Sequence, residues 1–423
     1  MLQVYKYLTY LLFPIVAVLI YFRSIFNKED KIRFKEKIFS SHFKINKNNN
    51  KKLIWFHAAS IGECLSILPL IDELNSKYKD IDFLITTITL SSASLLERKI
   101  NQTQNIVHQF FPLDCEHLVE NFLNNWKPTL VCFVDSEIWP NFLFKIKEKN
   151  IPLLLLNARL TRKSFNKWKI ISDFANKIFS NFDLCLAASE ESKNNLKYFQ
   201  IKKLKYIGNL KYSAPSLPQE LDEANKKILN SYKVWCATSI HSGEETSVLK
   251  THIEIKKKFN NVLTVVVPRH INRSLFIRNL SQKMGLHAQV LNEDKLVNSN
   301  VEILIINSFG SLSKYFNYCK NIFIGKSLLK GKKNVGGQNP IEAAKLGCKI
   351  FHGPYVYNFQ EVYELLYSYG ITKKIDNEIQ LSEELIKSFE AKITIDRKKI
   401  DLLNNYGEKI LKETMIEIGA YLK

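Results

Sequence analysis

The chain has 423 residues, 46% of them hydrophobic, which is enough to build the cores of two or three domains of ordinary size. Its 61 Lys and Arg residues against 41 Asp and Glu give a formal net charge of +20, which favours anionic partners such as phosphorylated lipid, a membrane surface or nucleic acid. Seven scattered cysteines form no C-x-x-C pair, and the histidines form neither H-x-x-H nor H-E-x-x-H, so neither a disulfide framework nor a bound metal is expected.

The N-terminal residues 1–22 are predicted to form a membrane anchor. Residues 7–22 carry no charge, and together with residues 1–6 they are long enough to cross a bilayer as a helix. A secretory signal peptide is disfavoured because no small-residue cleavage site follows. The remaining alternative is an apolar helix that packs on the protein's own surface.

A basic segment, residues 23–51, follows the anchor. Residues 23–52 contain ten Lys or Arg and only three Asp or Glu. Such a juxtamembrane segment is expected on the cytoplasmic side, where it is attracted to anionic lipid.

Residues 52–211 alternate short apolar runs with amphipathic stretches. Continuous apolar runs are typical of strands in a parallel sheet that is covered on both faces. The predicted strands are 53–58, 82–89, 107–113, 129–134, 152–157 and 183–188. Residues 63–78, ECLSILPLIDELNSKY, have the apolar spacing of a helix. The pattern predicts a Rossmann-like domain.

Residues 212–222, YSAPSLPQELD, interrupt this alternation with two prolines and are predicted to be a domain linker. The alternation then resumes over 223–423. The predicted strands of this second Rossmann-like domain are 234–239, 262–268, 301–307, 321–325 and 348–354. A last helix is expected near 396–422, with packing back on the first domain as one option. Parallel sheets bind ligands beyond the carboxyl ends of their strands, so two such domains are expected to face a central cleft.

Glu63 is the first candidate site residue. Ser60-Ile-Gly-Glu63 has the S-x-x-E form of a capping box, in which Ser60 accepts from the Glu63 amide and the carboxylate reaches back to the Ser60 amide. The alternative is a functional carboxylate acting as a general base, favoured by its place at the end of the first strand and by Gly62, which permits close approach of another molecule.

Other polar residues follow later strands of the first domain. Glu137 lies before Trp139-Pro140, where a helix begins, and is either a carboxylate favoured by the helix dipole or a site residue. Arg159 and Arg162 follow the next strand and are either phosphate contacts or a solvated basic turn. Lys211 ends the domain, and a lone lysine of this kind is usually solvated.

In the second domain, Pro268-Arg269 closes a strand, where an arginine suits a phosphate or nucleobase. The stretch GGQNPIEAA, 336–344, is a glycine-led turn with Asn339 as the expected helix cap, Pro340 in the first helical position and Glu342 two residues later. Such a turn presents backbone N–H groups to an anion, although without further evidence it is only a capped helix. The Walker spacing of G-K-[ST] is absent.

Taken together, the ordered stretches resemble one family. IWFHAASIGE, TTITLSSAS, FFPLD, SEIWPN, LLNARLTRKS, IGNLK, VPRHINR, FGSLSKYF and GGQNPIEAA occur in the order seen in the 3-deoxy-D-manno-octulosonate (Kdo) transferases of lipid A synthesis. The resemblance covers about residues 5–370. It implies an α/β fold of the GT-B type, with an acceptor-binding domain at 52–211 and a donor-binding domain at 223–423.

The resemblance also implies an activity: inverting transfer of Kdo from CMP-Kdo to a lipid A precursor (lipid IVA) at the cytoplasmic face of the bacterial inner membrane. Glu63 matches the family's general base, and Glu137 and Lys211 match its transition-state stabilisers. The matched CMP-binding residues are Pro268, Arg269, Phe309, Gly310, Ser311, Asn339, Pro340, Ile341 and Glu342. CMP-Kdo is a co-substrate; no cofactor, metal, nucleic acid or obligate protein partner is expected.

The chain departs from the family pattern around the donor pocket. Lys326 stands where the family usually has the second glycine of Gly-Gly-Ser, Gln338 where it has a histidine, and Ser311 where it has a glutamate. A GT-B enzyme using another nucleotide sugar therefore stays open as an alternative. A basic nucleic-acid-binding protein is the third reading, although no RNP motif, zinc knuckle or recognition-helix pattern accompanies the charge.

Overall fold

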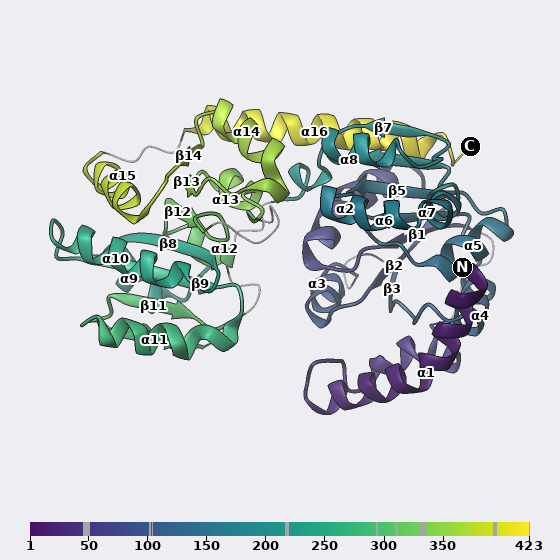
Figure 1. Cartoon of the computed structure of the whole chain (residues 1–423), viewed down its shortest axis with the longest axis horizontal. Coiled ribbons are helices and arrows are strands. Elements are labelled where there is room, and N and C mark those ends of the chain that lie inside the picture. The colour runs from purple at the N-terminus through teal and green to yellow at the C-terminus, as the bar shows by residue number, and fades with distance from the viewer. Residues whose placement is uncertain are drawn as a thin grey trace. The chain divides into compact units, whose positions relative to one another are not determined.

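The computed structural model describes residues 1–44, 51–100, 103, 105–215, 220–292, 295–308, 312–329, 336–391 and 396–422, apart from the side chain of Arg98. The chain divides into two compact units. Unit 1 consists of Met1–Pro215 with Tyr406–Lys423, and unit 2 of Ser216–Asn405. Each unit contains one seven-stranded sheet with its own set of helices (Figure 1).

The sheet of unit 1 is entirely parallel, with strand order β3-β2-β1-β4-β5-β6-β7. Its strands are β1 (Lys52–His57), β2 (Ile81–Thr87), β3 (Ile106–Phe110), β4 (Leu130–Val134), β5 (Leu153–Ala158), β6 (Leu184–Ala187) and β7 (Leu204–Tyr206). Its helices are α1 (Leu2–Ile25), α2 (Ile61–Lys77), α3 (Leu90–Ile100), α4 (Glu116–Trp126), α5 (Pro140–Glu148), α6 (Arg162–Ile170), α7 (Ser172–Phe179) and α8 (Glu190–Leu196). The direction of strand addition reverses between β1 and β4, which is where open sheets of this kind bind ligands.

The sheet of unit 2 repeats this arrangement, in the order β10-β11-β9-β8-β12-β13-β14. Its strands are β8 (Lys233–Ile240), β9 (Val262–Pro268), β10 (Ala288–Leu291), β11 (Ile303–Ile306), β12 (Asn321–Ile324), β13 (Lys349–His352) and β14 (Thr372–Lys374). Its helices are α9 (Glu223–Asn230), α10 (Glu244–Lys256), α11 (Ser274–Lys283), α12 (Leu312–Phe316), α13 (Ile341–Lys345), α14 (Gln360–Ser368) and α15 (Glu378–Glu390). Here the reversal lies between β8 and β12.

Each unit has its own apolar core. In unit 1, the fully buried Trp55 of β1 contacts the rings of Phe122, Phe133 and Phe142 at centroid distances of 4.8, 5.4 and 5.5 Å. In unit 2, Trp235 of β8 occupies the corresponding buried position. Because both faces of these central strands are covered, their residues form the continuous apolar runs that the sequence displays.

Regular structure in the N-terminal region continues beyond the predicted anchor. Helix α1 continues past residue 22 to Ile25, and two short 3-10 helices follow, η1 (Arg33–Lys37) and η2 (Ser40–His42). The basic segment does not present all of its charge to solvent. Lys37 is buried, with Nζ 2.6 Å from Oε2 of Glu29, and Arg33 pairs with Glu36. Residues 45–50 of the segment lie outside the described part of the chain.

The junction between the units lies at Pro215, inside the range predicted as linker. Tyr212 itself does not behave as linker: it ends η3 (Leu210–Tyr212), is buried, and contacts the ring of Tyr406 at 5.1 Å between centroids. Tyr406 belongs to α16 (Arg397–Gly419), which begins in unit 2 and ends in unit 1. The contact between the Tyr212 and Tyr406 rings explains why the junction lies at Pro215, after the predicted start of the linker at residue 212.

Candidate functional site

Glu63 lies in the first turn of α2, directly after β1. Its side chain is 8% exposed. Oε2 accepts a hydrogen bond from the Ala59 amide at 2.8 Å, and Oε1 accepts one from the Ser60 hydroxyl at 2.6 Å. Both oxygens are therefore held by residues of the loop between β1 and α2.

This geometry differs from the predicted capping box. The Ser60 hydroxyl donates to the carboxylate and does not cap the Glu63 amide, and the carboxylate reaches the amide of Ala59, one residue earlier than predicted. The structure thus removes the reciprocal box as the explanation of Ser60-x-x-Glu63.

The pKa of Glu63 is raised from its ordinary value to about 7. Burial is the largest cause, followed by the negative charge of Asp135, while the Ser60 hydroxyl acts in the opposite direction. The charge of Glu137 raises it further. A carboxylate with this pKa can take up a proton near neutral pH, which an ordinary glutamate does poorly.

Lys211 belongs to a polar network at the ends of β4 and β5. Its Nζ donates to Oδ2 of Asp135 at 2.8 Å, and the other oxygen of Asp135 accepts from the Asn157 side-chain amide at 2.6 Å. The side-chain oxygen Oδ1 of Asn157 in turn accepts from the Leu210 amide at 2.8 Å. An added Cβ at Gly62 would lie 4.0 Å from Cε of Lys211, so the lysine stem passes close to the first turn of α2.

The backbone at these strand ends is in the left-handed region. Asp135 has φ of 62° and Asn157 has φ of 52°. Asn and Asp adopt this conformation more readily than other non-glycine residues, and such conformations concentrate at functional sites. The network therefore holds Asp135 in a conformation that turns its carboxylate toward Lys211.

Glu137 lies two residues after Asp135. Its Oε2 accepts from the indole N–H of Trp139 at 2.8 Å and lies 3.2 Å from Nε2 of His57. His57 is fully buried at the end of β1, stacks on Phe111 at 3.8 Å between centroids, and has Nδ1 3.0 Å from Oγ1 of Thr86. Glu63, Lys211 and Glu137 thus lie around the strand reversal between β1 and β4.

Arg159 and Arg162 differ in how exposed they are. The Arg159 amide donates to the backbone oxygen of Asp135 at 3.2 Å, and its side chain is half-buried beside the network. Arg162 is exposed in the first position of α6, and its amide donates to Glu191 at 3.2 Å. Their role as phosphate contacts stays a prediction.

In unit 2, Glu244 organises the loop that follows β12. This residue is 1% exposed, and its carboxylate accepts from the amides of Lys326, Ser327 and Leu328 at 2.7, 3.0 and 3.1 Å. It also accepts from the His241 amide at 3.1 Å. One buried carboxylate therefore joins the end of β8 to the end of β12, across the strand reversal of this sheet.

Basic side chains lie around the same strand ends. The rings of His241 and His270 lie 5.9 Å apart, and burial, followed by the charges of Lys326, His270 and Arg269, lowers the pKa of His241 to about 4. Nε2 of His241 is buried and has no hydrogen-bond partner in the described structure. Arg269 and His270 are exposed directly after Pro268, and the Arg269 guanidinium presents positive charge at this edge of unit 2.

The turn at Gly336–Gly337 differs from the prediction in two ways. An added Cβ at Gly336 would lie 2.3 Å from the Tyr355 backbone oxygen, so the glycine admits neighbouring backbone. Helix α13 begins at Ile341 with Pro340 as its N-cap, one residue later than predicted, yet the Asn339 side chain accepts from the Ile341 amide at 3.1 Å, which is the hydrogen bond expected of a capping asparagine. Asn339 and Glu342 are exposed.

The three candidates Phe309, Gly310 and Ser311 lie outside the described residues. Three other residues of the two sites were missed by sequence reasoning: Asp135, His57 and Glu244. His57 and Asp135 lie at or just beyond the carboxyl end of a predicted central strand, and Glu244 is the first residue of the helix that follows another; all three adjoin a strand reversal. That position is the signal that could have found them.

Comparisons with known proteins show the family to which the chain is similar. A family described as "3-Deoxy-D-manno-octulosonic-acid transferase (kdotransferase)" matches residues 33–214. The 3-deoxy-D-manno-octulosonic acid transferase of Rickettsia bellii is 31% identical over 97% of this chain and 95% of its own length. The enzyme of the same name from Haemophilus influenzae is 26% identical over 85% of this chain and 83% of its own.

Among solved structures, a putative UDP-N-acetylglucosamine 2-epimerase from Listeria monocytogenes has a TM-score of 0.62 and 14% identity, over 88% of this chain and 97% of its own. At that identity the likeness concerns the fold alone. Together with the two parallel sheets, it confirms the predicted α/β fold of the GT-B type with two Rossmann-like domains.

Proposed function

The chain belongs to the 3-deoxy-D-manno-octulosonic acid (Kdo) transferases, and from this premise we propose that it moves Kdo from CMP-Kdo to a lipid A precursor with inversion at the anomeric carbon. Membership of the family makes the protein a glycosyltransferase. The donor, the lipid IVA acceptor and the stereochemistry are the finer parts of the proposal. The observation that carries it is the buried carboxylate of Glu63, whose pKa is about 7, in the first turn of α2 directly after β1.

Glu63 acts as the general base in this proposal. The oxygen of the acceptor hydroxyl attacks the anomeric carbon of Kdo, the bond from that carbon to the CMP phosphate oxygen breaks, and the hydroxyl proton passes to Glu63. A single displacement needs one base on the acceptor side and inverts the anomeric centre. Because the pKa of Glu63 is about 7, the protonated product state is accessible near neutral pH.

Glu137 and Lys211 stabilise charge in the transition state. Lys211 is fixed by Asp135, and Glu137 is fixed by Trp139 and His57. Groups held in place before the reaction need no reorganisation when charge develops. Arg159 and Arg162 are proposed to contact acceptor phosphates.

Unit 2 is proposed to bind CMP. The departing phosphate carries negative charge, and Arg269 and Lys326 at this edge supply the opposite sign. The proposed CMP-binding residues are Pro268, Arg269, Phe309, Gly310, Ser311, Asn339, Pro340, Ile341 and Glu342. No metal is needed for this chemistry, and transfer is expected to persist in EDTA.

Localisation at the cytoplasmic face of the bacterial inner membrane is also proposed. Helix α1 is long and apolar enough to reach across a membrane, by length and composition. The substrate partners are then CMP-Kdo, the lipid A precursor and anionic membrane lipid, without nucleic acid or an obligate protein partner.

The decisive experiment incubates purified protein with CMP-Kdo and tetraacylated lipid A precursor and weighs the products by mass spectrometry. A product heavier by one or more Kdo residues is expected. Glu63→Ala should abolish transfer while CMP still stabilises the protein against heat; Asp173→Asn, an exposed change on α7, is the matched control. Stabilisation by UDP alone, with none by CMP, would favour a different nucleotide sugar.

A further inference from the structure

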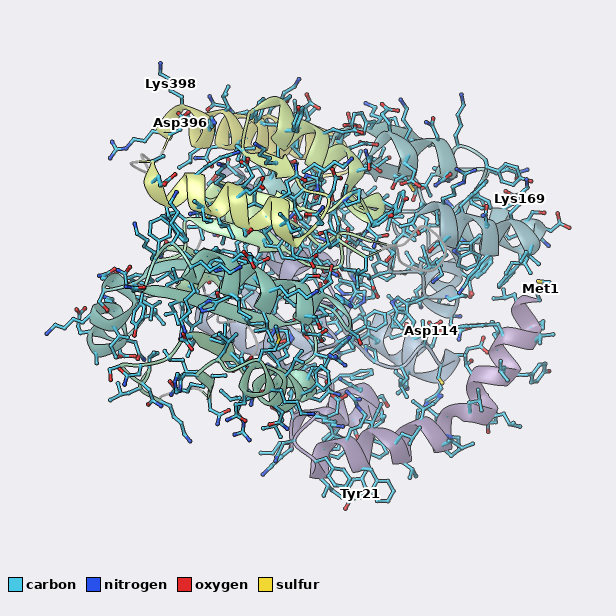
Figure 2. All side chains as sticks on the ribbon, turned by 60° about the vertical axis from the view of Figure 1, so that its left-hand side comes forward. Met1, Tyr21, Asp114, Lys169, Asp396 and Lys398 are labelled. Carbon is cyan, nitrogen blue, oxygen red and sulfur yellow. The ribbon has the colours of Figure 1, made fainter. Side chains whose placement is uncertain are left out.

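Helix α1 is fixed to unit 1 at its N-terminal end. The Tyr5 hydroxyl donates to Asp114 at 2.8 Å, and Nζ of Lys6 lies 2.5 Å from Glu116 in the first turn of α4. Thr9 Oγ1 accepts from the Asn141 side-chain amide at 3.3 Å, at the beginning of α5. Figure 2 shows Asp114 on the side of the unit that faces the N-terminal turns of α1.

The same helix is fixed to the same unit at its other end. Ile20 is buried in a cluster with Phe34 and Ile38 of the segment around η1. Arg23 donates to Glu29 at 2.9 Å, and Glu29 also pairs with the buried Lys37. Between the two ends, the Phe13 ring meets His117 at 5.1 Å. Contacts with unit 1 therefore run along the whole helix.

A helix that spans a bilayer has its two ends on opposite sides. With 24 residues, α1 is about 36 Å long, enough to cross a hydrocarbon core of about 30 Å. In that orientation Lys6, Glu116 and the buried Asp114 would have to enter or cross the hydrocarbon, or the contacts at one end would have to break. Ion pairs and buried carboxylates are expensive in that environment.

The face of α1 turned away from unit 1 is apolar. Its members, each more than half exposed, include Leu8, Leu11, Ile15, Val18, Leu19 and Phe22. Their spacing of three and four residues places them on one side of the helix. Tyr7, Tyr10 and Tyr21 are also at least half exposed, and Figure 2 shows Tyr21 pointing outward. Tyrosines at both ends suit the headgroup level of a membrane.

Pro14 lies in the middle of α1. Proline removes one helical hydrogen bond and bends the helix. Figure 1 shows α1 (purple) changing direction partway along, with its N-terminal part beside α4. The bend allows both halves to follow the surface of unit 1.

We infer that α1 lies in the plane of the cytoplasmic leaflet as a monotopic helix and does not span the bilayer. The inference rests on the proposed membrane localisation and deepens it. The occupant of the exposed apolar face is the acyl boundary of an anionic leaflet, since exposed Lys28 and Lys31 follow the helix. Asn141, which contacts Thr9 of α1, is only four residues beyond Glu137, so the helix on the membrane lies close to the loop that carries Glu137.

The test uses full-length protein in liposomes of phosphatidylethanolamine and phosphatidylglycerol, with single cysteines added to the wild-type chain. Its seven native cysteines are all buried and give a low background. Gln3→Cys and Lys28→Cys mark the two ends of α1, and Gln200→Cys marks the surface of unit 1. An impermeant maleimide added outside should label all three in outward-facing protein. A spanning helix would leave Gln3→Cys unlabelled until detergent is added, and would overturn the inference.

Depth is measured separately. A fluorophore on Leu11→Cys should be quenched most by lipids brominated near the headgroup; strongest quenching by bromines at the chain ends, or no quenching at all, would contradict an in-plane helix. Kdo transfer is assayed on the same liposomes. Protection of Gln3→Cys with normal transfer refutes the orientation alone, whereas labelling of both ends without transfer by wild-type protein refutes the proposed function alone.

Discussion

Nζ of Lys211 lies 2.8 Å from Oδ2 of Asp135, and the same carboxylate raises the pKa of Glu63. Asp135, which the sequence analysis did not select, thus acts on Lys211 and Glu63, which it did select. Asp135 holds the proposed stabilising cation in place, and its negative charge makes Glu63 a stronger base.

Asp135→Asn tests this double role. Asparagine tolerates the left-handed backbone at φ 62°, so the fold should persist. Loss of the ion pair should lower kcat by roughly tenfold or more, on the scale of losing an oriented charged group. Steady-state kinetics with CMP-Kdo and lipid acceptor measure the effect. Unchanged kcat would mean that Lys211 needs no carboxylate to stay in place.

The pH dependence of transfer gives a second prediction. Below pH 7 Glu63 is increasingly protonated and cannot accept the hydroxyl proton, so kcat/KM of the wild type should rise with pH through about 7 and then level off. In Asp135→Asn the same limb should move to lower pH, because a negative charge near Glu63 is gone. If kcat/KM of the variant rises over the same pH range as that of the wild type, the titration belongs to a group other than Glu63.

Glu63→Gln should separate stability from activity. The folded pKa of Glu63 is about 7 against an ordinary value of 4.5, so the folded state binds more protons between these values and wild-type stability falls as pH rises through that window. Glutamine can keep the contacts with Ala59 and Ser60 without a buried charge. The variant should be inactive, yet more stable than wild type at pH 8 by about 1–3 kcal/mol.

Thermal unfolding at pH 4 and pH 8 measures this difference. At pH 4 both proteins carry a neutral side chain at position 63, and their midpoints should coincide. A glutamine variant that is less stable than wild type at pH 8 would show that the charged carboxylate is structurally required.

The central strands of both sheets were predictable from sequence because both of their faces are buried. The three strands that escaped prediction are β7, β10 and β14, and each lies at the edge of its sheet. Edge strands are covered on fewer sides, and these carry mostly exposed or half-exposed residues such as Lys205, Gln289 and Lys373. Without an apolar run, the sequence offers no strand signal.

The site was predictable in part for a related reason. Glu63, Glu137 and Lys211 lie in stretches that resemble a family, so pattern alone selects them. Asp135 and Glu244 act through hydrogen bonds between strand ends that are distant in the chain, and such pairings depend on strand order. The order itself reverses between β1 and β4 and between β8 and β12, which local periodicity does not encode.

Glu244→Gln should disrupt the proposed CMP-binding edge of unit 2. The buried carboxylate accepts four backbone N–H groups, and an amide would turn its own N–H₂ toward some of them. Leaving such donors unpaired should cost about 1–3 kcal/mol and disorder the loop around Ser327. CMP should then no longer raise the thermal midpoint. Glu254→Gln, which alters a partly exposed carboxylate on the same helix, should leave CMP binding intact.

Lys326→Gly returns the position to the residue that the family usually has, and it tests what the lysine contributes. Lys326 has φ of 58°, a conformation that costs an ordinary L-residue about 1 kcal/mol and glycine nothing. Part of that gain is lost because glycine is more flexible in the unfolded chain, so unit 2 should be stabilised by about 0.5 kcal/mol.

The Lys326→Gly variant also loses a cation beside His241, whose pKa should rise from about 4. CMP should bind more weakly, and with less dependence on salt. Lys326→Ala removes the same charge and keeps the backbone cost, so it should weaken CMP binding without stabilising the protein. Equal CMP affinity in wild type and both variants, measured by calorimetry, would show that this lysine does not face the nucleotide.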